Sequence, residues 1–237
     1  MYSDFESISV YSITVSIAGA ALVIQSIFST VWAPIVYKLA LQEGGDIKIF
    51  AITRYVTLAV VIAFSLGGLF SWVVPLFLPE EYYEVEYLLP ACLGYPLLYA
   101  LSEATMVGLG VARRSGLTML AAIVALMVNV VGNYLFVPKY GASGAAGTTA
   151  LTFFIFLVLR TEFSCRVWKP FARSYVYGFS LAAVLLSLLG LYAGTNRLVV
   201  QTLWIGLLVF TCLYFRAELI SILRFFYSRF FLFLQRN

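Results

Sequence analysis

The chain has 237 residues, of which 62% are hydrophobic and only 11% are charged, and its mean hydropathy is +0.97. Soluble domains average about 25% charged residues, so this composition excludes a water-soluble globular fold and predicts an integral membrane protein. The formal net charge of +4 comes from scattered basic residues, which is not the clustered pattern of a protein that binds nucleic acid.

Apolar stretches of about 20 residues predict membrane-spanning helices. In chain order the candidates are residues 8–33, 55–75, 88–111, 117–137, 142–159, 175–192 and 198–215. Proline lacks the backbone donor of an α-helix, so we expect bends near Pro34 in the first span and near Pro96 in the third. Residues 1–215 are therefore predicted to form an all-α polytopic membrane bundle of about seven helices.

The remaining residues, 216–237, have a different pattern. Arg224 and Arg229 interrupt a run of Phe, Leu and Ile residues, which makes this segment too charged for a good span. Basic amphipathic helices of this kind lie along a membrane surface, with their arginines among the headgroups. We expect a cytoplasmic tail that contacts membrane lipids.

Basic residues alternate between the two sides of the predicted bundle. Only Lys139 and Arg197 follow even-numbered spans, and the other 13 of the 15 Lys and Arg residues follow odd-numbered spans, Arg160 among them. The positive-inside rule then predicts an outside N-terminus and a cytoplasmic C-terminus. An odd number of spans with an outside N-terminus leads us to expect a preceding half, in a larger transporter or in the parent of a split or shortened gene.

Glu103 is the one ionisable residue that we place deep within a predicted span. A carboxylate is costly in lipid, so it should face the bundle interior or a wet cavity, and such residues are often functional. Tyr95, Tyr99, Met106 and Gly110 share its helical face. Aromatic rings beside a carboxylate can bind sugar; alternatively Glu103 binds a cation or proton, or pairs with a neighbouring helix.

Four basic residues are candidates for binding phosphate on the cytoplasmic side. Arg113 and Arg114 end the third predicted span, and Lys38 and Arg54 lie at a similar depth on other helices. A guanidinium can bind two phosphate oxygens at once. The alternative is that these residues only anchor the topology.

Asn129 and Asn133 are four residues apart in the fourth predicted span, so both should face inward. They either bond across helices or line a cavity. Together with the aromatic and basic residues above, they complete the predicted substrate-binding set.

Catalytic and metal-binding motifs are not found in the sequence. It has no histidine, and its three cysteines are far apart, so we expect no metal and no cofactor. A membrane-embedded glycan-assembly enzyme would need a catalytic acid or base near a membrane face. The one candidate cluster, Glu80–Glu86, is interpreted as a solvated outer loop with interfacial tyrosines, and the chain is predicted not to be an enzyme.

One segment carries a family resemblance. The run Asn133-Tyr-Leu-Phe-Val-Pro138-Lys-Tyr-Gly141-Ala-Ser-Gly-Ala-Ala-Gly-Thr148 combines an asparagine-ended helix, a Pro-x-Tyr-Gly turn and a Gly-Ala-Ala helix start. Pro138 should end one helix, and Gly141 should allow a tight reversal. With Trp32-Ala-Pro34 and Arg113-Arg-Ser-Gly116, this run resembles polysaccharide flippases of the multidrug/oligosaccharidyl-lipid/polysaccharide exporter superfamily, over roughly residues 5–165.

The resemblance implies the C-terminal half of a transporter with two helix bundles and alternating access. It implies export of undecaprenyl-linked oligosaccharide across the bacterial inner membrane, in O-antigen, lipopolysaccharide or other polysaccharide biosynthesis. The implied partners are this lipid-linked substrate and an N-terminal helix bundle or glycan-assembly proteins. The alternatives are a multidrug or cation antiporter of the same superfamily, a membrane-embedded enzyme, and a non-functional truncated product.

Overall fold

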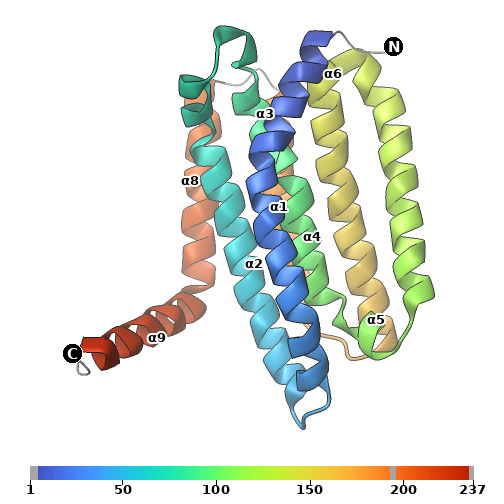
Figure 1. Ribbon diagram of the computed structural model, residues 1–237, viewed down its shortest axis with the longest axis vertical. Helices are drawn as coiled ribbons and strands as arrows, with labels where there is room; N and C mark the ends of the chain where they lie inside the picture. The colour runs from blue at the N-terminus through green and yellow to red at the C-terminus, as the bar shows by residue number, and fades with distance from the viewer. Residues whose placement is uncertain (1–4, 193–195, 235–237) are drawn as a thin grey trace.

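The computed structural model describes residues 5–192 and 196–234, and all regular elements in these ranges are helices (Figure 1). They are α1 (Phe5–Ala40), α2 (Gly45–Leu69), the 3-10 helices η1 (Ser71–Phe77) and η2 (Glu80–Tyr82), α3 (Val85–Cys92), α4 (Gly94–Thr105), α5 (Val107–Val111), α6 (Ser115–Val167), α7 (Ser174–Tyr192), α8 (Arg197–Tyr214) and α9 (Arg216–Leu234). Five of them, α1, α2, α6, α7 and α8, are long and apolar enough to cross a membrane. The fold is therefore all-α, and it has the helices of a membrane protein.

Helix α6 is folded back on itself at Gly141, where φ is 51° and ψ is −127°. Residues 115–140, here called the outgoing leg, run to one end of the molecule, and residues 142–167, the returning leg, run back (Figure 1). Helical geometry continues past Pro138 to Tyr140, so the reversal begins at the glycine and not at the proline. The legs approach closely, because a Cβ on Gly144 would collide with the backbone carbonyl of Phe136.

The third predicted span is broken into α3, α4 and α5. The interruptions fall at Leu93 and Met106, and Pro96 lies in the first turn of α4, where a proline is tolerated. None of these three helices is long enough to be among the five candidate spans. The first predicted span, by contrast, extends through Pro34 to Ala40. Two of the seven predicted spans are thus the legs of α6, and one is a chain of short helices.

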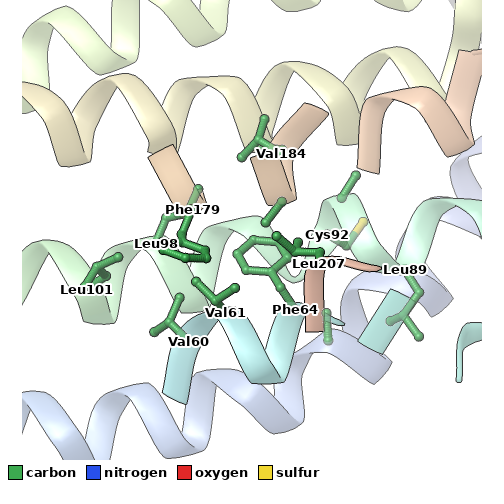
Figure 2. Close-up of a cluster of buried hydrophobic side chains, with 14 of the residues drawn as sticks. Val60, Val61, Phe64, Leu89, Cys92, Leu98, Leu101, Phe179, Val184 and Leu207 are labelled. Carbon is green, nitrogen blue, oxygen red and sulfur yellow. The ribbon is translucent and has the colours of Figure 1, made fainter. Parts of the chain in front are cut away.

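The largest cluster of buried apolar side chains lies where α2, α3, α4, α7 and α8 meet. Figure 2 shows its central members, Val60, Val61, Phe64, Leu89, Cys92, Leu98, Leu101, Phe179, Val184 and Leu207. Lipid is as apolar as these side chains, so close van der Waals packing holds membrane helices together more than the expulsion of water does. This core fixes α4, whose other side packs against α6.

Successive turns alternate between the two ends of the bundle (Figure 1). The α1–α2 turn and α5 lie at one end, and η1, η2 and the reversal of α6 lie at the other. Helix α9 leaves α8 at the end that holds α5 and points away from the bundle. The tail that begins at Arg216 therefore forms a separate helix, and its position along the membrane surface stays a prediction.

Candidate functional site

Glu103 of α4 forms an ion pair with Arg160 of the returning leg. The Arg160 Nη2 atom donates to Glu103 Oε1 over 2.8 Å, and the two side chains are only 4% and 15% exposed, respectively. The prediction that Glu103 faces the bundle interior is confirmed. The assignment of Arg160 to a loop is wrong, because the helix continues to Val167 and carries Arg160 inside the bundle. The bundle therefore contains two charged residues here, Glu103 and Arg160, where the sequence suggested Glu103 alone.

Polar and aromatic groups surround the Arg160 guanidinium. Its Nη1 atom donates to Ser102 Oγ over 2.7 Å, and the Met106 sulfur is in contact with Nη2. The guanidinium carbon lies 4.8 Å from the centroid of the Phe156 ring and 5.4 Å from that of Tyr99. Cation–π attraction and the Glu103 carboxylate together balance the positive charge where water is scarce. Nε of Arg160 is the one buried nitrogen of this group without a hydrogen-bond partner.

Above this ion pair lies a groove of about 400 Å³ between α4 and the two legs of α6. Aromatic rings form much of its wall: Tyr95 packs on Phe153 with centroids 4.5 Å apart, and Tyr99 stacks on Phe156 at 6.0 Å. We call this hollow the aromatic groove; its lining residues are Tyr95, Tyr99, Ala122, Ala125, Leu126, Asn129, Thr149, Thr152, Phe153 and Phe156. The structure thus gathers three of the predicted site residues, Tyr95, Tyr99 and Asn129, around one groove.

The two asparagines of the outgoing leg form a short hydrogen-bonded ladder beside the groove. Asn133 Nδ2 donates to Asn129 Oδ1 over 2.9 Å, and Asn129 Nδ2 points to Thr152 Oγ1 of the returning leg at 3.4 Å. A bond between the two legs is confirmed for Asn129, which also lines the aromatic groove, whereas the hydrogen bond of Asn133 stays within its own leg. Asn133 Oδ1 is buried without a hydrogen-bond partner, so the ladder ends in a free acceptor.

The four predicted basic residues do not form one group. Arg113 lines a second, open hollow of about 560 Å³ together with Tyr37 of α1; Arg113, Arg114 and Lys38 are all exposed, and Arg114 and Lys38 are not part of its lining. Arg54 lines neither hollow. It forms an ion pair with Glu218 of α9.

Aromatic rings of the C-terminal helices surround Arg54. Its guanidinium carbon is 5.3 Å from the centroid of Tyr175, 5.4 Å from that of Phe215 and 5.9 Å from that of Tyr214. Arg54 therefore holds the tail helix to α2 and faces away from the aromatic groove's wall residues. The sequence could not reveal this role, because the two partners are 164 residues apart.

Comparison with models of known protein families, with curated proteins and with solved structures found no match. The flippase resemblance therefore stays a prediction. Within the described part of the chain, no group of three or more His, Cys, Asp or Glu side chains could hold a metal ion.

Proposed function

We propose that this chain is one half of a transporter that moves a lipid-linked oligosaccharide across the bacterial inner membrane. The aromatic groove is the observation that carries the proposal. The faces of Tyr95 and Tyr99 suit the C–H faces of a sugar, and the amide of Asn129, which lines the groove, offers hydrogen bonds to its hydroxyl groups. Such a site binds a polar, uncharged ring within an otherwise apolar protein.

The ion pair favours a sugar over a coupling cation. A cation antiporter needs a carboxylate whose charge is available to the transported ion. The Glu103 carboxylate is already neutralised by Arg160 at 2.8 Å and lies beneath the rings that line the groove. The Glu103–Arg160 pair supports the groove wall without presenting an unpaired charge to a ligand in the groove.

The proposed topology has seven crossings, with the N-terminus outside and the C-terminus in the cytoplasm. The alternating turns support it, with each leg of α6 as one crossing and α3–α5 as another (Figure 1). Removing the buried Arg160 from the loop count leaves 12 basic residues on one side and two on the other. The positive-inside bias therefore persists after this correction.

The groove also suggests why a second bundle is needed. Only 11% of the most apolar window of α6 is buried, and the outgoing leg forms one wall of an open hollow. Polar side chains such as Asn129 would otherwise face lipid, which is unfavourable. An N-terminal bundle or a partner protein would close the groove into a cavity.

A binding experiment tests the proposal on the full chain in nanodiscs of neutral phosphatidylcholine. Two ligands are titrated, a polyprenyl diphosphate carrying an oligosaccharide and the same lipid without sugar. We expect the sugar to increase affinity about tenfold, roughly 1.4 kcal/mol, and Tyr95→Leu to remove most of this increase. Tyr134→Leu is the matched control, because Tyr134 is on the outgoing leg but 71% exposed and outside the groove. Equal affinity of both ligands for the unmodified chain would reject the proposal.

A further inference from the structure

The two hollows beside α6 lie next to each other. Ala122 of the outgoing leg lines both of them. Met106 lines the second hollow and contacts Arg160, whose guanidinium lies over the Tyr99 ring of the first. The two hollows therefore follow one another from Tyr95 to Arg113, and the second lies beside α5 at its end of the bundle (Figure 1).

The lower hollow has the chemistry of an anion site. Among its lining residues are one cation, Arg113, and the hydroxyl groups of Tyr37, Ser115 and Thr118, and none of its lining residues is acidic. Within residues 5–192 and 196–234, Arg113 is in no ion pair. A guanidinium beside hydroxyl donors, with no carboxylate to neutralise it, suits a phosphate group.

The backbone of Arg113 strengthens this interpretation. Helix α5 ends in a Schellman motif: the Arg114 amide donates to the Leu109 carbonyl, and the Arg113 amide donates to the Gly110 carbonyl. The left-handed position of this motif is normally a glycine, because a side chain there is strained. Arg113 occupies it with φ of 52°, and it is the one non-glycine residue with positive φ in the described part of the chain. The fold thus keeps an arginine where its backbone geometry favours glycine.

We propose that Arg113 and Tyr37 form a binding site for the phosphate group of an amphipathic ligand whose other parts extend along the groove. The inference deepens the proposed function, since it names the anionic part of the ligand for the same groove, but it does not depend on sugar. Of the four basic residues that were predicted to bind phosphate, Arg113 is the one that lines this hollow. Gly110 supports it, because a Cβ there would collide with the Tyr37 hydroxyl and displace it.

The test is titration of farnesyl diphosphate, which carries no sugar, into the full chain in phosphatidylcholine nanodiscs. Arg113→Gly removes the charge and the backbone strain together, so it should weaken binding at least tenfold while leaving the thermal unfolding midpoint unchanged or raised. Arg114→Gly is the matched control, because Arg114 is the neighbouring basic residue and does not line the hollow. This substitution should change the affinity less than twofold. Tyr37→Phe and Gly110→Ala should each weaken binding several-fold.

Two further comparisons identify the source of the phosphate and separate this inference from the proposed function. Anionic phosphatidylglycerol nanodiscs should weaken farnesyl diphosphate binding if bilayer phospholipid also occupies the site; unchanged affinity would assign the site to the diphosphate alone. Equal losses for Arg113→Gly and Arg114→Gly, or no binding to the unmodified chain, would overturn the inference. Loss of the sugar preference with retained dependence on Arg113 would reject only the oligosaccharide part.

Discussion

Burial of the Glu103–Arg160 pair between two helices carries a desolvation cost that its other contacts must offset. Arg160 also donates to Ser102, and it lies over the rings of Tyr99 and Phe156. Removing one partner of such a pair leaves an unbalanced charge in a low dielectric, which is usually worse than removing both. The pair therefore behaves as one unit that fixes α4 to the returning leg.

We expect Glu103→Gln to lower the free energy of unfolding by roughly 3 kcal/mol, because Arg160 is then buried without a counter-charge. The double variant Glu103→Gln with Arg160→Met should recover at least half of that loss. Chemical unfolding in detergent micelles, with a double-mutant cycle, measures both values. Losses that simply add would show that the two side chains do not interact.

The burial of Glu103 could be predicted from the sequence, but the burial of Arg160 could not. A lone acid in an apolar run stands out, whereas a basic residue at the end of a run resembles a topology anchor. The fifth predicted span stopped at residue 159 and was only 18 residues long, short of the roughly 20 that a bilayer requires. Extending it would have placed Arg160 inside the helix.

At the scale of single elements, the reversal of α6 depends on Gly141. Its φ of 51° is a conformation that side chains rarely adopt, and the nearest side-chain atom to an added Cβ is Ser7 Oγ at 3.1 Å. Gly141→Ala should therefore destabilise the protein by about 1–2 kcal/mol. Gly178→Ala in α7 is the control, because it meets open space in a regular helix and should be neutral or slightly stabilising. Thermal unfolding of the two variants gives the comparison, and equal midpoints would contradict the role of Gly141.

The tail helix α9 is held to the bundle by the half-buried Arg54–Glu218 ion pair and by Leu219 and Ile222, which pack against the main apolar core. Glu218→Ala should release it, because Arg54 then loses the carboxylate that draws α9 toward α2. We expect faster amide hydrogen exchange in α9 with little change in α2. Ser221→Ala is the control, since its hydroxyl bonds only within its own helix, to the Ala217 carbonyl. Unchanged exchange in the Glu218 variant would mean that α9 is anchored by other means.

Element boundaries show where sequence patterns carry information and where they do not. The glycine of the α6 turn could be predicted, because few other residues adopt positive φ. The break at Leu93 lies three residues before Pro96, where a bend was expected, whereas Met106 is apolar and compatible with a continuous helix. On either side of Met106, Gly108 and Ser102 bond to Ser164 and Arg160 of the returning leg, more than 50 positions away, and such pairings leave no local pattern in the sequence.

For the whole molecule, the distribution of charge and the alternating turns together predict which end faces the cytoplasm. Glu81 belongs to η2, at one end of the bundle, and Lys48 belongs to the first turn of α2, beside the α1–α2 turn at the other end (Figure 1). Both side chains are exposed, so a cysteine at either position would be accessible from its own side. The native Cys92 and Cys165 are buried, and Cys212 is half-buried.

This orientation can be measured in cells by single-cysteine labelling. In a chain with its native cysteines changed to alanine, Glu81→Cys should react with a membrane-impermeant maleimide in intact cells, because the outer face is exposed to the reagent. Lys48→Cys should react only after permeabilisation, because the positive-inside bias retains that turn in the cytoplasm. A third site, Tyr140→Cys beside the Gly141 turn, distinguishes seven crossings from five. It should label from outside if both legs of α6 cross the membrane, and only after permeabilisation, or not at all, if α6 does not cross as two legs.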